Sequence, residues 1–294
     1  MYNILMVFFK KHYIISLVTI YFSKLIIESI INMIFNGIYG RLIISGIIII
    51  ISIIFGYFYI FGFKIKNILK GLYLGLPFIF AGIFYLLLSL SFIEYIGFSM
   101  PDNNITGFKI LKIFELNALK NIFNSNYFKH YYYFRFDYYD LFNGILFMIS
   151  VGIYEEIFFR GIILNILMKN CKRNKLFLIV IASIIFGITH LINLVNMHEY
   201  YIGIISQMLY TIVIGIFLSI IYIKYNNIWP VIIIHIIFNC MSIMPFLLFS
   251  EFEYLYLLHS NIYIAFIDII ISLFYLLYSI KIYKKLKIPE ENVA

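Results

Sequence analysis

Hydrophobic residues run along this chain in eight long, nearly continuous stretches that short polar connections separate. Each stretch is close to or above the ~20 residues that an α-helix needs to cross the hydrocarbon core of a bilayer. The apolar residues do not alternate with polar ones as they would in a barrel strand, so the pattern predicts helices. The predicted spans lie at 13–35, 42–63, 72–96, 139–168, 176–195, 201–223, 228–250 and 261–283.

Composition supports a membrane protein. Hydrophobic residues make up 64% of the chain and charged residues 12%, whereas a soluble domain carries about 25% charged residues. The sequence therefore predicts an all-α, polytopic membrane bundle of about eight transmembrane helices, with the lipid bilayer as its first partner. The net charge of +8 does not indicate a nucleic-acid partner, because the lysines lie between the spans. The two cysteines, Cys171 and Cys240, suggest neither a disulfide framework nor a cysteine metal site.

Basic residues are distributed unequally between the two sets of connections. Only Arg41 lies in the short connections of one set, whereas the other set and the chain ends hold fourteen basic residues: Lys10, Lys11, Lys64, Lys66, Lys70, Lys169, Lys172, Arg173, Lys175, Lys224, Lys281, Lys284, Lys285 and Lys287. Short cytoplasmic loops carry an excess of Lys and Arg. We therefore expect a multi-pass protein of the cell membrane with both termini in the cytoplasm.

The spans fall into three groups, without an internal repeat. Residues 1–138 hold three scaffold spans and a long connection, 97–138, whose aromatic residues predict a cover along the outer interface. Residues 139–250 form a core of four spans that holds the candidate catalytic residues, and 251–294 hold the last span and a basic cytoplasmic tail. The pattern specifies no oligomeric state.

Two glutamates and an arginine lie inside the fourth span. An ionisable side chain at that depth costs roughly 2.5–3.5 kcal/mol on insertion scales, so such residues are usually functional. Glu156 and Arg160 are four residues apart and share a helix face, which predicts an ion pair. Glu155 lies about 100° further round the helix and is left for chemistry.

Two further spans bring polar residues to a similar depth. Phe186 and His190 share a face of the fifth span, and His235 and Asn239 share a face of the seventh. Glu155 and His190 are each roughly 21 Å from the cytoplasmic ends of their helices at 1.5 Å per residue. Glu155, His190, His235 and Asn239 are therefore predicted to meet.

Charged residues also lie deep in the first and last spans. Lys24 and Glu28 are four apart in the first span, which favours a self-paired couple, and Asp268 in the last span is expected to pair with a neighbouring helix.

The motifs Glu155-Glu156-x-x-x-Arg160, Phe186-x-x-x-His190 and His235-x-x-x-Asn239 resemble those of the type II CAAX prenyl endopeptidases. This family (CPBP or ABI) of intramembrane proteases is also linked to bacteriocin processing and immunity. The resemblance covers about 139–245, including the Trp229-Pro230 before His235. It implies that Glu155 and His190 activate a water, that His235 and Asn239 bind the oxyanion, and that Glu156 and Arg160 support them. The implied substrate is a membrane-embedded or lipid-linked peptide.

Several alternatives stay open. Glu155, His190 and His235 also form a plausible zinc ligand set, although no His-Glu-x-x-His is present and a metal-independent glutamate mechanism is favoured. Ser183 and Thr189 have no base at useful spacing, which argues against a serine mechanism. A proton-coupled transporter would also place such residues at mid-membrane, and a catalytically silent immunity or scaffold protein would keep the fold. For a protease we expect a cavity open to the cytoplasm and laterally to lipid, and closed on the outer face.

Overall fold

The structure is a computed structural model that describes residues 12–35, 37–99, 138–195, 197–249 and 262–286. These residues form helices and contain no strand, so the predicted all-α fold class is confirmed. Six helices are long and apolar enough to cross a membrane, and the α3 helix and the Trp229–Ser242 part of α12 are shorter apolar helices. The chain is a multi-pass membrane bundle.

The helices follow the predicted spans in order, with some changes at their ends. They are α2 (Tyr13–Ile34), α3 (Ile38–Ile54), α4 (Ile65–Ser99), α8 (Tyr138–Glu156), α9 (Asn165–Asn170), α10 (Lys175–Ile188), α11 (Tyr201–Tyr225), α12 (Trp229–Phe249) and α14 (Ile262–Lys285). A π-helix, η3 (Ile157–Leu164), joins α8 to α9, and 3-10 turns form η1 (Phe58–Phe61), η4 (Thr189–Val195) and η5 (His198–Tyr200).

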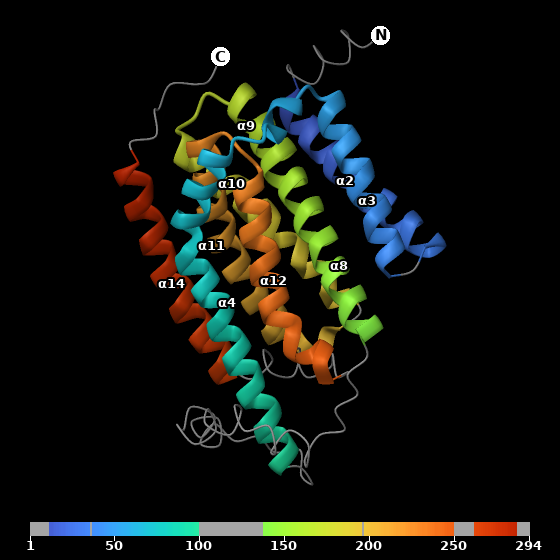
Figure 1. Cartoon of the computed structure of the whole chain (residues 1–294). Coiled ribbons are helices and arrows are strands. Elements are labelled where there is room, and N and C mark those ends of the chain that lie inside the picture. The colour runs from blue at the N-terminus through green and yellow to red at the C-terminus, as the bar shows by residue number, and fades with distance from the viewer. Residues whose placement is uncertain (1–11, 36, 100–137, 196, 250–261, 287–294) are drawn as a thin grey trace.

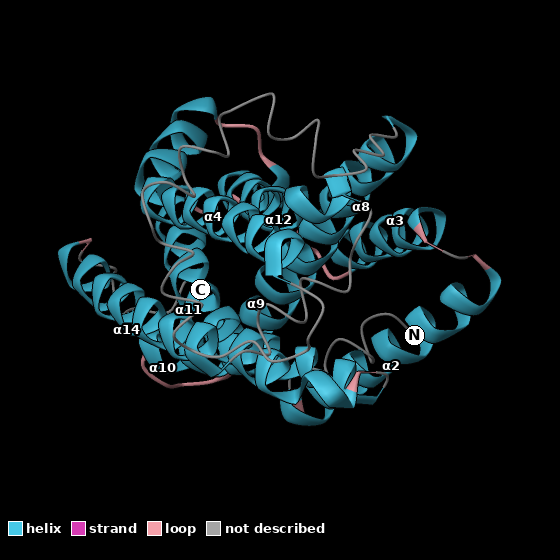
Figure 2. Ribbon diagram, turned by 90° about the horizontal axis from the view of Figure 1, so that it is seen from below, coloured by secondary structure: helices cyan, strands magenta, loops and turns pink. Residues whose placement is uncertain are grey.

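Helix α12 lies in the middle of the bundle, packed against α4 on one side and α8 on the other (Figures 1 and 2). Helix α11 packs against α10 and α14, while α2 and α3 lie on the opposite side, where α3 contacts α8. The first turn of α2, the connection from α9 to α10 and the last turn of α14 lie at one end of the bundle (Figure 1), here called the lysine-rich end. The first turns of α8 and α11 form part of the opposite, far end.

The second predicted span, 42–63, is wrong at its C-terminal end. Helix α3 ends at Ile54, and Gly56 adopts a left-handed φ of 77° that a residue with a side chain rarely takes. The apolar run continues because the connection packs onto the start of α12: the Ile228 amide donates to the Ile60 carbonyl at 3.2 Å. The Trp229 indole donates to the Phe61 carbonyl at 3.1 Å. Hydrophobicity here reflects burial in protein and not a membrane crossing.

Glycines let α12 approach both of its neighbours closely. A Cβ added to Gly75 of α4 would collide with Ile234, and one added to Gly152 of α8 would lie 2.6 Å from Cγ1 of Ile236. Small residues at such contacts are the usual means by which membrane helices gain van der Waals contact. They fix the distance between α12 and α8, the two helices that carry His235 and Glu155. The predicted position of the connection 97–138 along the outer interface falls almost wholly outside the described residues.

Candidate active site

Glu155 and Glu156 close α8, and the backbone widens into a π-helix directly after them. All eight residues of η3 are buried. A π-helical turn inside an α-helix is rare and is frequently found at functional sites. Because successive residues differ by about 100° around the axis, the two glutamates face different neighbours.

Glu156 lies in the packed interior and forms the predicted ion pair. The Arg160 guanidinium donates through Nη1 to Oε1 of Glu156 at 2.8 Å, and both side chains are almost fully buried. The guanidinium carbon also lies 4.6 Å from the ring centroid of Phe186, a distance at which the ring face attracts a cation. The charge of Arg160 is thus held by one carboxylate and one aromatic face.

The same Glu156 oxygen has a second partner that the sequence analysis did not foresee. Oε1 lies 2.6 Å from Nδ1 of His235, so the imidazole donates its Nδ1 proton to this carboxylate. The other ring nitrogen, Nε2, then faces the cavity, 3.5 Å from Oε2 of Glu155. A carboxylate on one nitrogen of a histidine determines which nitrogen is presented to the reaction. Glu156 therefore orients His235 as well as neutralising Arg160.

Phe186 and His190 complete the group from the end of α10. Helix α10 ends at Ile188, so His190 lies in the 3-10 turn η4 and not in a continuing α-helix. The ring of Phe186 contacts both histidines, with centroids 5.5 Å from that of His190 and 6.1 Å from that of His235. Nε2 of His190 is buried and has no hydrogen-bond partner among the described residues. The His190 residue nevertheless lines the cavity wall.

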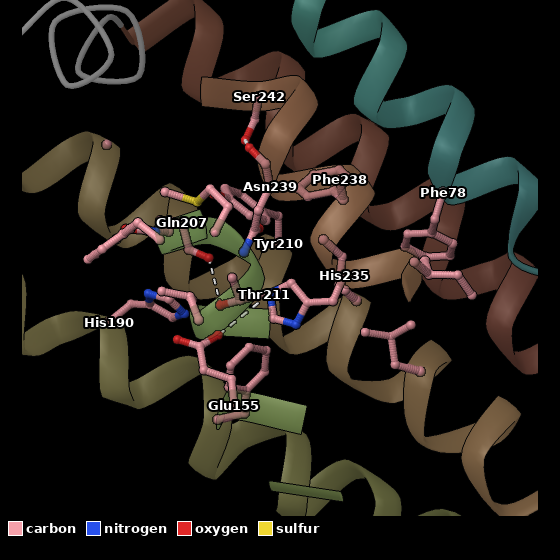
Figure 3. Close-up of a pocket in the computed structure, with 18 of the residues that line it drawn as sticks. Phe78, Glu155, His190, Gln207, Tyr210, Thr211, His235, Phe238, Asn239 and Ser242 are labelled. Atoms are coloured by element: carbon pink, nitrogen blue, oxygen red, sulfur yellow. Dashed lines mark hydrogen bonds and ion pairs between the residues drawn. The ribbon is translucent and has the colours of Figure 1, made fainter. Parts of the chain in front are cut away.

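Glu155, His190, His235 and Asn239 line one cavity of about 450 Å³ (Figure 3). The structure thus brings together the four residues that the sequence analysis selected from three separate spans. Most of the remaining lining is apolar: Phe78, Phe147, Met148, Val151, Phe186, Ile214, Leu218, Ile234 and Phe238. A few polar groups in an apolar pocket of this size are typical of a ligand-binding or active site.

The cavity extends in the opposite direction to the expected one. From Glu155 it follows α8 back to Gly144, and from His235 it follows α12 onward to Ser242. On α11 it reaches Gly203, near the first turn of that helix. These residues lead towards the far end, whereas the helices are packed solidly towards the lysine-rich end. The cavity therefore leads away from the lysine-rich end, at which the sequence analysis expected its opening.

The sequence analysis missed several residues that line the cavity, which come from α11 and α4. Gln207, Tyr210 and Thr211 of α11 line its wall, and Phe78 of α4 lines the deep part (Figure 3). The spacing of Gln207, Tyr210 and Thr211, at i, i+3 and i+4, places them on one helix face. Polar side chains repeated on one face of an apolar span were the available signal. Phe78 had none, because nothing distinguishes it from other apolar residues of its span.

Two observations concern the residues of the zinc and serine alternatives. Among the described residues, no three His, Cys, Asp or Glu side chains are grouped so that they could hold a metal ion. The Ser183 hydroxyl donates to the Ile179 carbonyl at 2.7 Å, and the Thr189 hydroxyl to the Phe186 carbonyl at 2.5 Å. Each hydroxyl thus bonds to the backbone of its own segment, as Ser and Thr in apolar helices commonly do.

The other charged residues that the sequence analysis selected, Lys24, Glu28 and Asp268, have structural partners. Lys24 pairs with Glu28 at 2.8 Å, as expected, and Glu28 also accepts from Arg41 at 3.1 Å and from the Tyr154 hydroxyl at 2.5 Å. Asp268 is buried and accepts from the Ser206 hydroxyl of α11 at 2.9 Å. Asp268 therefore binds a neighbouring helix, as its isolation in the sequence suggested.

Comparison with known proteins agrees with the geometry. No curated protein and no solved structure matches the chain. A protein-family model matches residues 138–241, which carry all three motifs and about a third of the chain. Over this segment the chain is a match to the family described as type II CAAX prenyl endopeptidase Rce1-like, and the resemblance inferred from the three motifs is confirmed.

Proposed function

We propose that this protein is an intramembrane endopeptidase that hydrolyses a peptide bond with a water activated by Glu155. One observation carries the proposal: Glu155, His190, His235 and Asn239 line a single cavity inside an apolar bundle. A bundle gains no stability from gathering costly polar groups around a hollow, so their convergence favours chemistry. The match of residues 138–241 to the prenyl endopeptidase family supports the same reaction class.

Glu155 is the proposed general base. Its side chain is 16% exposed, enough to reach a water in the cavity. In the proposed reaction the carboxylate takes a proton from water while the water oxygen attacks the carbonyl carbon. The same proton then passes to the amide nitrogen as the C–N bond breaks, so one water is consumed and Glu155 is regenerated. His190 is the proposed partner of Glu155 in orienting the water, because both residues line the same cavity.

His235 and Asn239 are the proposed donors to the oxyanion. They are one helical turn apart on α12, and both face the cavity (Figure 3). When both ring nitrogens of His235 carry a proton, Nδ1 donates to Glu156 and Nε2 donates to the developing negative charge. Glu156 and Arg160 act as positioning residues, because their ion pair holds the carboxylate that orients the imidazole.

The proposed substrate is a membrane-embedded or lipid-linked peptide. The cavity wall is mainly apolar, with aromatic side chains at Phe78, Phe147 and Phe238. Such a wall accepts an apolar residue or lipid-like group next to the scissile bond. Comparing prenylated with unprenylated peptides tests whether a prenyl group is required. A metal is not part of the proposal.

The experiment is hydrolysis of a peptide panel by the purified full-length protein in detergent and in lipid vesicles. The panel compares apolar, acylated and prenylated peptides, with the Glu155→Gln variant as the matched control. We expect cleavage by the wild type, loss in the variant, and no effect of a metal chelator. Loss of activity with the chelator, restored by zinc, would replace the glutamate mechanism with a metallopeptidase. If the folded protein cleaves no peptide, the protease proposal is wrong and a scaffold or immunity protein is favoured.

A further inference from the structure

We infer that the substrate enters the cavity from the extracytoplasmic side of the membrane, as a peptide segment lying at the outer leaflet. That the entering peptide is a substrate rests on the proposed endopeptidase function. The side from which the cavity is reached can be measured without catalysis. It joins two independent observations: the distribution of positive charge along the chain, and the direction in which the cavity extends from Glu155.

Positive charge identifies the cytoplasmic end. Among the described residues, Lys172 and Arg173 are exposed in the connection between α9 and α10, and Lys284 and Lys285 lie in the last turn of α14. All four lie at the lysine-rich end. A surplus of Lys and Arg in short connections marks the cytoplasmic side. Arg41, in the first turn of α3, is the one Lys or Arg at the far end among the described residues, and its charge is paired with Glu28 at 3.1 Å.

The bundle is solid between the cavity and the lysine-rich end. On η3, Ile162, Ile163 and Leu164 are at most 1% exposed, and on α11 Ile220 and Ile221 are fully buried. The start of α12 is equally closed, since Ile228 and Val231 have no exposed surface. The η1 connection packs onto this region through the backbone bond between Ile228 and Ile60. A peptide cannot reach Glu155 through these layers without unfolding them.

The opposite direction is hollow. The cavity is bounded by Gly144 and Phe147 on α8, by Gly203 and Gln207 on α11, and by Ser242 on α12. Gly144 and Gly203 add no side chain to the cavity wall there. Polar groups at Gln207 and Ser242 also lie on this route and can bind the backbone of an extended peptide. The route therefore leads from the far end to the catalytic residues.

The two observations together define the substrate class. If the lysine-rich end is cytoplasmic, the hollow half lies in the outer half of the membrane, so we expect a tail that remains in the cytoplasm not to be cleaved. Exported peptides anchored at the outer surface, or outward-facing ends of membrane proteins, have the required position. Their apolar residues partition into the outer leaflet and bring the chain to the mouth of the cavity.

Single cysteines measure the side of access directly. In a Cys171→Ala, Cys240→Ala background, three full-length variants are compared in spheroplasts with a membrane-impermeant maleimide: Met148→Cys in the cavity, Val195→Cys at the far end and Lys172→Cys at the lysine-rich end. Val195 is 76% exposed, so it reports the end even where the cavity is narrow. We expect Val195→Cys and Met148→Cys to react in intact spheroplasts, and Lys172→Cys only after permeabilisation. The reverse pattern at Val195 and Lys172 overturns the inference, and so does a Met148→Cys that reacts only after permeabilisation.

Oriented vesicles separate this inference from the proposed function. An impermeant quenched peptide with apolar residues is added outside right-side-out or inverted vesicles, with Glu155→Gln vesicles as controls. We expect cleavage by right-side-out vesicles alone. Cleavage by inverted vesicles alone overturns the access inference and leaves the endopeptidase standing. If neither kind of vesicle nor the detergent-solubilised protein cleaves the peptide, the proposed endopeptidase is wrong. The maleimide pattern then still decides the side of access.

Discussion

The same helices form a packed half and a hollow half of the bundle. Towards the lysine-rich end, η3, α11 and α12 meet through fully buried side chains such as Ile162, Ile220 and Val231. Towards the far end, the preceding part of α8 and the same two helices α11 and α12 surround the cavity, with polar groups at Glu155, Gln207 and Asn239. Both halves are built largely from apolar residues. The two halves differ in how side chains from separate helices pack. The packed half stabilises the bundle, whereas the hollow half leaves room for a ligand.

The largest expected effect is on catalysis in the hollow half. Glu155→Gln removes the proposed base while keeping the side-chain volume, so peptide hydrolysis should fall about a thousandfold. Unfolding in detergent should change little, because this side chain borders the cavity and its contact with Nε2 of His235 is long, at 3.5 Å. Activity and thermal unfolding measured on the same preparation check both parts. A variant that loses stability as much as activity would erase the distinction between the halves.

The next effect lies at the boundary between the halves. Glu156→Gln leaves the buried Arg160 without its charge partner, which should lower the free energy of unfolding by about 3 kcal/mol. It also weakens the bond that orients His235, so activity should fall in the molecules that remain folded. Arg160→Met in the same chain removes the unpaired charge and should recover part of the stability without restoring full activity. Equal instability of the single and double variants would contradict the pairing.

A matched pair of substitutions on α11 compares the halves directly. Ile221→Ala removes a fully buried side chain from the packed half and should cost about 2 kcal/mol or more, because a void replaces its contacts. Ile214→Ala removes a side chain that already borders the cavity, so its cost should be smaller. It should instead widen the range of peptides cleaved. Chemical unfolding of both variants in one detergent gives the comparison, and equal losses would mean that the hollow half is packed in solution.

The smallest effect concerns the spacing between α8 and α12. Gly152→Ala places a methyl group 2.6 Å from Cγ1 of Ile236, so one helix must shift or the isoleucine must change rotamer. The stability cost should be about 1 kcal/mol. Activity should fall more than stability suggests, because the shift moves Glu155 away from His235. Gly46→Ala is the control, since an added methyl group there meets no atom within 4 Å.

The sequence predicted much of the fold because each helix needs only a continuous apolar stretch. It failed at 42–63, where the apolar run covers a buried connection, and it had no means of foreseeing the π-helix after Glu156. The Glu156–Arg160 pair was predictable because its two members share one helix. The bond from His235 to Glu156 was not, because it joins helices 79 residues apart in the chain. The direction of the cavity depends on such contacts between helices, which hydrophobicity does not encode.

The last three residues of α8 point in three different directions, and two of them bind other helices. Tyr154 donates to Glu28, which Lys24 and Arg41 also bind on the side of α2 and α3. Glu155 faces the cavity, and Glu156 is bound to both Arg160 and His235. In mechanical terms a turn of α8 about its own axis would break the bonds from Tyr154 to Glu28 and from His235 to Glu156, which join it to other helices. We therefore expect any movement that admits a peptide to come from tilting or sliding of the helices that face α8, while α8 itself stays in place.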